Sequence, residues 1–387
     1  MTETNPDIDV DLAAAGATAT FREIRQQPDV WLEAASIVQG RRADLDAFLA
    51  PLLAHDDLRI VFTGAGTSAF AGGVVAPTVA RATGRRVESI ATTDIVSNPR
   101  HYLAEDVPTL LVSFARSGNS PESVAATRLT DQVLGDASHL VITCNAGGAL
   151  AQEHQERPDS FVLLMPQRSD DAGFAMTSSF TSMMLSALLA FLGDAPETVA
   201  ALSSAADQVI GEDWDSIKGL AQDGLRRLVY LGSGPLAALA QESALKTLEL
   251  TAGGVVSYHD SSLGFRHGPK AVLDAETLVV VYISNDPYTR SYDLDIVAEL
   301  RTAIGASRVL SVATDGVGEG AIVLEGLRGT DDGYLAIAYI LVAQILALSF
   351  ALRVGTTPDN PFPGGDVNRV VQGVHIHELE DSAGDGR

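Results

Sequence analysis

Short apolar runs alternate with longer helical patterns along most of this 387-residue chain. The runs are apolar at consecutive positions rather than at every second one, which is typical of parallel strands buried on both faces. In the first half, strands are expected at 58–62, 86–91, 108–114, 138–143 and 159–165, and helices at 69–83, 121–135 and 174–192. This alternation predicts an α/β fold: a parallel sheet with helices on both faces, which binds ligands at the carboxyl ends of its strands.

The same pattern occurs twice. In each half, an apolar strand runs straight into a Gly-x-Gly turn. This turn begins at Gly64 in the first half and at Gly232 in the second. A second strand that ends in a polar turn covers 109–114 and again 277–283, and each pair of landmarks is about 170 positions apart. Because this offset is the size of an ordinary domain, the sequence predicts two tandem domains of one fold.

The repeat and its flanks divide the chain into four segments. Residues 1–45 are expected to form a helical arm with an amphipathic stretch at 21–37, and 46–200 and 201–355 to form the two domains. Residues 356–387 begin rich in Pro and Gly, continue as a terminal strand with His375 and His377 on one side, and end in an acidic tail.

Composition excludes several kinds of partner and location. The 26 basic and 50 acidic residues give a net charge of −24, which disfavours nucleic acid as a partner. Cys144 is the only cysteine, so a reducing, cytoplasmic location is expected, and residues 1–12 lack the apolar core of a signal peptide. Two apolar stretches, 172–193 and 335–352, are long enough to cross a membrane. Their matching places in the repeat, and polar residues such as Gln344, predict buried core helices and no membrane partner.

A turn rich in Ser and Gly follows the second strand of the first half, over residues 113–122. Serine hydroxyls, backbone N–H groups and the start of a helix at Pro121 would converge there on an anion such as a phosphate. The alternative is a simple helix cap by Ser120 with an exposed Arg116. The earlier turn, from Gly64 to Ala69, fits a loose dinucleotide fingerprint with Glu88 downstream, but that pattern is weak and no cofactor is expected.

Candidate acid–base residues lie in the second half. Glu242, Lys246 and Glu249 share one face of the helix that follows the second Gly-x-Gly turn, where an ordinary salt bridge is the alternative explanation. A glutamate buried there would have a raised pKa, in the range useful for proton abstraction. His267 precedes a Gly-Pro turn, and its spacing from His259 matches no common metal site, so no metal is expected.

Together these motifs resemble the sugar isomerase (SIS) domain family. The residues that carry the resemblance are 63–68, 115–120, Glu249 and 267–269. The tandem arrangement is similar to the isomerase half of glucosamine-6-phosphate synthase. From about residue 20 to about residue 377, including 356–361 and 367–373, the chain most resembles the D-galactosamine-6-phosphate deaminase/isomerase family, long described as tagatose-6-phosphate ketose/aldose isomerases.

The resemblance implies a doubly wound five-stranded parallel sheet in each half, and a homodimer whose active sites each take a histidine from the neighbouring subunit. It also implies roles for individual residues. The binding set for phosphate and sugar would be Gly66, Thr67, Ser68, Ser113, Arg116, Ser117, Ser120 and Thr177. Glu249 would move the proton between C1 and C2, His267 would open the sugar ring, and Glu242 and Lys246 would support them.

Two departures from the synthase pattern limit the chemistry expected. Gln372 stands where the synthase has a lysine, which argues against a covalent imine with the enzyme, and no glutaminase domain is expected. The leading interpretation is an isomerising deaminase that acts on a phosphorylated amino sugar. The alternatives are a plain ketose/aldose isomerase of a hexose 6-phosphate and a sugar-phosphate sensor without chemistry.

Overall fold

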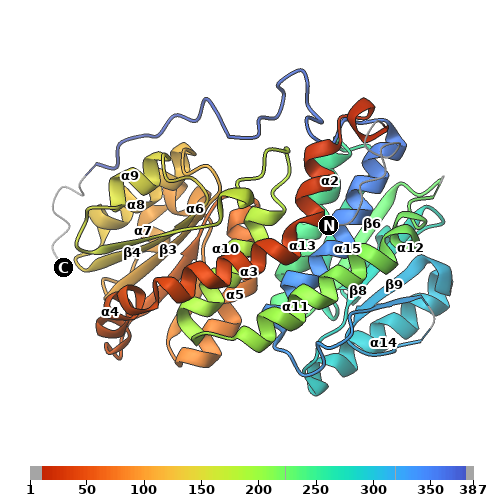
Figure 1. Ribbon diagram of the computed structural model, residues 1–387, viewed down its shortest axis with the longest axis horizontal. Coiled ribbons are helices and arrows are strands. Elements are labelled where there is room, and N and C mark those ends of the chain that lie inside the picture. Colours follow the sequence, from red (N-terminus) through yellow and green to blue (C-terminus); the bar gives the residue numbers. More distant parts are fainter. Residues whose placement is uncertain (1–10, 223, 319, 381–387) are drawn as a thin grey trace.

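Two five-stranded parallel sheets dominate the computed structural model, which describes residues 11–222, 224–318 and 320–380 (Figure 1). The first has strand order β2-β1-β3-β4-β5. The second has the order β10-β9-β8-β6-β7, which is the same winding read from the other edge. The predicted duplicated α/β fold is therefore confirmed; the acidic N-terminus at 1–10 and the end of the acidic tail lie outside the described residues.

The elements of the first half follow the predicted order within a few residues. Its strands are β1 (Arg59–Thr63), β2 (Arg86–Ser89), β3 (Thr109–Ala115), β4 (Ala137–Thr143) and β5 (Ser160–Leu164). Its helices are α5 (Thr67–Thr83), α6 (Thr92–Ser97), α7 (Pro99–Tyr102), α8 (Pro121–Val133), α9 (Ala149–His154) and α10 (Ser178–Leu192). All residues of β1 and β3 are buried, as expected for strands covered on both faces.

The second half repeats this succession. Its strands are β6 (Arg227–Gly232), β7 (Val256–Ser261), β8 (Thr277–Tyr282), β9 (Val309–Ala313) and β10 (Ala321–Val323). Its helices are α11 (Pro196–Gln208), α12 (Trp214–Lys218), α13 (Pro235–Leu250), α14 (Pro287–Ile304) and α15 (Asp332–Val354). The domain boundaries proposed from sequence stay a prediction.

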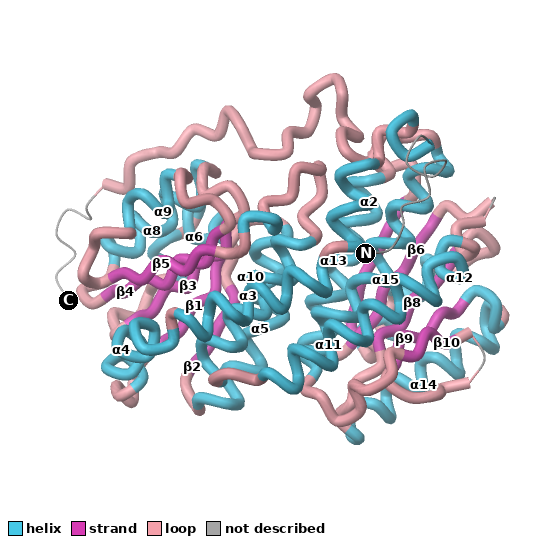
Figure 2. The backbone as a smooth tube through the Cα atoms, in the orientation of Figure 1, coloured by secondary structure: helices cyan, strands magenta, loops and turns pink. Residues whose placement is uncertain are grey.

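A layer of helices lies between the two sheets and joins them into one core (Figure 2). The inward faces of both sheets and helices α5, α10, α13 and α15 belong to a single apolar cluster. Helix α15 is long and apolar enough to cross a membrane, yet 94% of its most apolar window is buried inside the protein. Both apolar stretches are thus core helices, as predicted.

The ends of the chain differ from the sequence prediction in two places. The amphipathic stretch at 21–37 is split between α2 (Thr18–Arg25) and α3 (Gln27–Gly40), because Pro28 begins a new helix, and α4 (Arg42–Leu53) follows. The predicted terminal strand at His375 and His377 is wrong. This segment is extended but pairs with no strand in the described chain, and side chains rather than a neighbouring strand bind its carbonyl groups, as Gln132 does at Leu379 (2.8 Å).

Candidate functional site

The first wall of the candidate site is the turn between β1 and α5. Gly64 allows the chain to fold back tightly, because a Cβ atom there would lie 2.5 Å from Ser68. Gly66 has φ = 55°, a conformation that glycine adopts readily, and starts α5. Thr67 and Ser68 therefore stand at the first turn of a helix and at the carboxyl end of a central strand.

The second wall is the turn between β3 and α8, which the sequence singled out as an anion site. Its shape is fixed from outside: the Asn145 amide donates to the Ser117 carbonyl (2.9 Å), and the Asn119 side chain accepts from Ala149 N–H (2.9 Å). Ser120 stands at the N-cap position of α8 but its side chain makes no capping hydrogen bond. Its hydroxyl is therefore free to bind a ligand at the helix N-terminus, and the Ser117 hydroxyl, which accepts from Asn119 N–H (3.3 Å), can still donate to one.

Arg116 is buried in this turn with only 6% of its surface exposed. Its guanidinium donates to the carbonyls of Phe174 (3.2 Å) and Arg369 (3.0 Å), and no carboxylate of the described chain forms an ion pair with it. Burial, followed by the charge of Arg369, lowers the pKa of Arg116 from its usual value. A buried cation without an ion pair is unfavourable unless an anion binds beside it.

Both turns open into one cavity of about 220 Å³, and Glu249 of α13 reaches it from the second half. The described residues that line it are Ala65, Gly66, Thr67, Ser68, Phe114, Ala115, Arg116, Ser117, Gly118, Ser120, Ser123, Phe174, Met176, Glu249, Val367, Asn368, Arg369 and Val371. The close packing of α13 against α5 brings the carboxylate to the Ser/Arg turn. One small molecule in this cavity can therefore contact both a cationic and an anionic group.

Behind Glu249, a lysine is buried between two carboxylates. The Lys246 ammonium lies 2.5 Å from Glu249 and 3.3 Å from Glu242, and donates to the Thr67 hydroxyl (2.9 Å). Burial raises the pKa of Glu242 to about 8, and one of its oxygens has no partner among the described residues. Burial alone would lower the pKa of Lys246, but the two carboxylates outweigh it and raise that pKa. The glutamate of this helix whose pKa burial raises, as the sequence predicted for a buried one, is thus Glu242, which lies behind the cavity.

The loop 171–174 supplies the carbonyls to which Arg116 and Arg369 donate. Asp171 accepts from Thr177 N–H (2.8 Å) and Ser179 N–H (2.9 Å), and Glu23 of α2 accepts from Ala172 N–H (2.7 Å). Burial, and next the charge of Asp171, raises the pKa of Glu23 to about 7. These capping bonds explain why α10 begins at Ser178 and not at 174, as the sequence predicted.

Besides Glu242 and Lys246, which lie behind Glu249, four predicted residues do not line the cavity of this chain. His267 is exposed on the loop after β7, and Gln372 is exposed on the C-terminal segment. The Ser113 hydroxyl is buried in β3 without a partner in the described chain, and Thr177 binds Asp171 instead. Glu88, proposed for a dinucleotide, pairs with Arg59 at 2.5 Å.

Sequence reasoning missed three polar residues of the site: Glu23, Asp171 and Arg369. Glu23 and Arg369 act across long sequence separations, as in the bond from Arg116 to the Arg369 carbonyl, whereas the Asp171 carboxylate binds residues only six to eight positions away. Only Arg369 had a local signal, since it lies in the 367–373 stretch on which the family resemblance rests.

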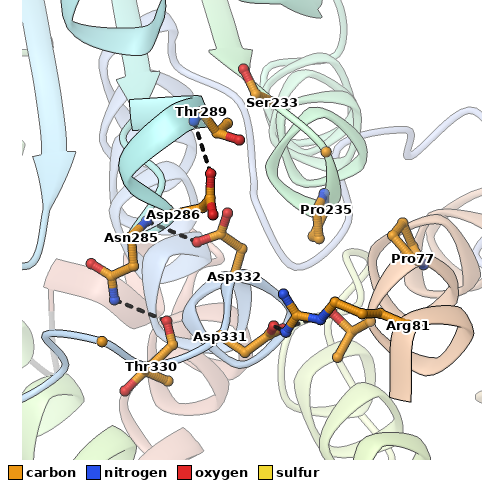
Figure 3. A pocket seen from close by; sticks show the side chains of 13 residues that line it. Pro77, Arg81, Ser233, Pro235, Asn285, Asp286, Thr289, Thr330, Asp331 and Asp332 are labelled. Atoms are coloured by element: carbon orange, nitrogen blue, oxygen red, sulfur yellow. Dashed lines mark hydrogen bonds and ion pairs between the residues drawn. The ribbon is translucent and has the colours of Figure 1, made fainter. Parts of the chain in front are cut away.

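The second half has a cavity in the equivalent place, of about 380 Å³ (Figure 3). Here the turn that opens α14 is already occupied by a carboxylate of the chain itself. Asp332 accepts from the Ser284 hydroxyl (2.5 Å) and from Asn285 N–H (2.9 Å). Arg81 reaches in from α5 and pairs with Asp331.

Comparison with known proteins places this fold and site in a class. The SIS domain family model matches residues 52–193, so the first half is a SIS domain by sequence as well as by fold. The second half repeats the same sheet winding.

Relatives over the whole chain define the family more closely. A Streptomyces coelicolor protein provisionally named D-galactosamine-6-phosphate deaminase AgaS is 57% identical over 94% of this chain and 97% of its own. The D-galactosamine-6-phosphate deaminase AgaS of Escherichia coli is 48% identical, with the same coverage. The crystal structure of tagatose-6-phosphate ketose/aldose isomerase from Escherichia coli has a TM-score of 0.86 and 44% identity, covering 95% of this chain and 99% of that one. The chain belongs to the AgaS family of SIS-domain enzymes.

Proposed function

We propose that this protein converts D-galactosamine 6-phosphate and water to tagatose 6-phosphate and ammonia. The observation that carries the proposal is the single cavity in which a buried, unpaired arginine and a glutamate face one ligand. Relatives that share 57% and 48% of their residues with this chain bear the deaminase name, which supports the choice of substrate.

The phosphate binds at the turn before α8. The Arg116 guanidinium offers further N–H donors besides the two that bind carbonyls, and the hydroxyls of Ser117 and Ser120 stand beside it. Anchoring the phosphate fixes the position of the sugar carbons, so binding energy far from the reacting atoms orients C1 and C2. Thr67 and Ser68 line the path between the two ends.

Glu249 moves the proton. In the open-chain aldose it removes the hydrogen from C2, and the electron pair of that bond forms the C1–C2 double bond while the C1=O π pair moves to O1, which takes a proton from water, giving an enolamine. The same carboxyl returns the proton to C1 while the amino group gives up one proton to water, which leaves an imine at C2. Water then adds to C2 and ammonia departs, giving the ketose. Lys246, at 2.5 Å, holds the Glu249 carboxylate in place, while Glu242 behind it has a raised pKa and supports the lysine.

The sugar ring opens with help from a second copy of the chain. His267 is exposed and lies outside its own chain's cavity, so it is available to a neighbouring subunit. The edge strand β7 just before it exposes Val256 (56%) and Tyr258 (36%), apolar groups suited to a dimer interface. In the homodimer, His267 of one copy serves the cavity of the other. The enzyme works in the cytoplasm, a reducing location that fits its single free cysteine.

Shared sites can be tested by complementation. Co-expression of E249Q and H267N, each nearly inactive alone, is expected to give hybrid dimers with one intact site and to restore up to about a quarter of wild-type activity, since a general acid or base contributes ~100-fold or more. Failure to restore activity, with hybrid dimers confirmed by two affinity tags, would contradict a shared site.

The function itself is tested by ammonia release. The purified protein is incubated with galactosamine 6-phosphate, glucosamine 6-phosphate and galactose 6-phosphate, and ammonia and ketose are measured separately. Ammonia together with tagatose 6-phosphate from the first substrate is the expected result. Ketose from galactose 6-phosphate, with no ammonia from either amino sugar, would replace the proposal by plain isomerisation, the activity named for a relative of known structure.

A further inference from the structure

The C-terminal segment crosses from the second half over the cavity of the first. After α15 ends at Val354, the chain runs along the outside of the molecule toward the first sheet, as the last blue stretch of Figure 1 shows. On the way, Val367, Asn368, Arg369 and Val371 become part of the cavity wall. The candidate site is thus completed by residues far from both Gly/Ser turns in sequence.

Arg369 carries a positive charge into this wall without a carboxylate at hydrogen-bond distance. Its guanidinium donates to the carbonyls of Gly173 (3.2 Å) and Asp171, while the Asp170 carboxylate lies 3.7 Å away. Its side chain keeps 39% of its surface exposed. Because a guanidinium has five N–H donors, several remain for a ligand.

The loop 171–174 holds the two arginines of the cavity together. Arg116 donates to the Phe174 carbonyl and to the main chain of Arg369, and Arg369 donates to the carbonyls of Asp171 and Gly173. Two cations in one small cavity repel each other, and the carbonyls, together with the nearby carboxylates of Asp170 and Asp171, compensate part of that repulsion. A phosphate monoester carries a charge of about −1.5 to −2 and three acceptor oxygens, which matches two guanidiniums better than one.

We propose that Arg369 is a second phosphate-binding residue, brought to the site by the C-terminal segment. This inference rests on the proposed phosphosugar function and adds a residue to it. Arg116 binds the phosphate from the floor of the cavity and Arg369 from the wall, so that the pair selects phosphorylated sugars over free ones.

Arg369 is not the sole anchor of the segment, because other contacts hold it on either side. Before the cavity, Asp359 accepts from Ala19 N–H (2.9 Å) and Thr20 N–H (2.8 Å) at the start of α2. Beyond it, the Arg100 guanidinium donates to the Glu380 carbonyl (2.5 Å). A variant at Arg100 therefore loosens the same segment without touching the cavity, and provides a matched control.

The experiment compares R369Q, R369K and R100Q with wild type as full-length proteins whose melting temperatures are checked first. Isothermal titration is done with inorganic phosphate, galactosamine 6-phosphate and unphosphorylated galactosamine. R369Q is expected to bind both phosphate ligands about ten- to a hundredfold more weakly, the size of a charge-assisted hydrogen bond. R369K should lose part of that affinity, because lysine lacks the fork, and R100Q should stay within about twofold.

Three results would overturn the inference: unchanged phosphate binding in R369Q, equal weakening by R100Q, or equal loss of galactosamine and its 6-phosphate. If R369Q is unstable, R369K, which keeps the charge, supplies the comparison. The outcome is independent of catalysis. A protein that binds galactosamine 6-phosphate through Arg369 but releases no ammonia would refute the proposed function and leave this inference standing.

Discussion

The two halves of this protein share one backbone and differ in the charges placed on it. Gly66 and Gly234 have nearly the same conformation, with φ/ψ of 55°/−125° and 57°/−127°. Arg81 precedes Glu249 by the same number of positions that separates these glycines, and each projects from its helix toward the cavity of the other half. The duplication thus gives two equivalent cavities with opposite groups at the same point.

The turn before the second helix differs in the same sense. In the first half it carries Arg116 and two serine hydroxyls that can still donate to a ligand. In the second half it is shorter, and the carboxylate of Asp332 already accepts its N–H and hydroxyl donors. An anionic ligand has donors available in one cavity and a negative charge in its place in the other. The fold therefore supplies the position of a site, while a few side chains decide whether that site binds phosphate.

The largest expected effect comes from replacing the charged group that faces each cavity by an uncharged one. E249Q should lower kcat for ammonia release by about 100- to 10,000-fold, because it removes the proposed base, while its equivalent R81Q should change kcat less than about twofold. Steady-state kinetics on both variants provide the measurement. A loss of tenfold or less in E249Q would exclude Glu249 as the base.

The next prediction concerns the free energy of unfolding. It compares the two equivalent residues that lie one helical turn before Glu249 and Arg81. K246M should reduce the free energy of unfolding by about 3–5 kcal/mol, because it leaves Glu242 and Glu249 without the cation buried between them. Its equivalent in α5 is Thr78, whose hydroxyl donates to Asp331 at 2.7 Å. T78V should therefore lose only about 1 kcal/mol. Urea denaturation of the two variants measures both losses. Equal losses of unfolding free energy would mean that the Lys246 ion pairs contribute no more to stability than exposed ones do.

A third test asks whether Asp332 is structural only. D332N should lower the free energy of unfolding by about 1–3 kcal/mol, since the buried carboxylate accepts from Ser284 and Asn285, while kcat remains within about twofold of wild type.

Titration of the wild-type protein with galactosamine 6-phosphate should give one site per chain. Two sites of similar affinity would show that the second cavity binds phosphosugars as well.

How far the sequence predicts this molecule depends on the range of each interaction. The strands, the core helices and the Arg116 and Glu249 positions follow from local patterns, because consecutive apolar residues and helix spacing carry the information. Arg369 and Glu23 could not be found in this way, since their partners are brought together only by the folded chain. The carboxylate of Asp171 binds residues six to eight positions away, but no helix or strand period marks that loop contact. The terminal strand at His375 was predicted from alternation alone, and alternation does not say whether a partner strand exists.

The smallest predicted effect separates the halves by their response to acid. His154 of α9 is buried; burial, followed by the charges of His139 and Arg157, lowers its pKa to about 4. An unfolded histidine, with a pKa near 6.5, binds a proton that the folded one rejects, so stability is lost as pH falls from about 6.5 toward 4.

By pH 5 this loss should reach about 1–2 kcal/mol, and H154Q should flatten that part of the stability curve, whereas H101Q, at an exposed histidine, should not. The rings of His154 and His139 of β4 lie 4.7 Å apart, and β9, the equivalent of β4 in the second half, contains no titratable residue. Burial also lowers the pKa of His259 in β7, but the large shift is that of His154, so acid should open the first half before the second. Urea denaturation between pH 7 and pH 4.5 measures the slope, and hydrogen exchange followed by mass spectrometry assigns it to a half. Equal exchange in both sheets, or a slope that H154Q leaves unchanged, would remove His154 as the cause.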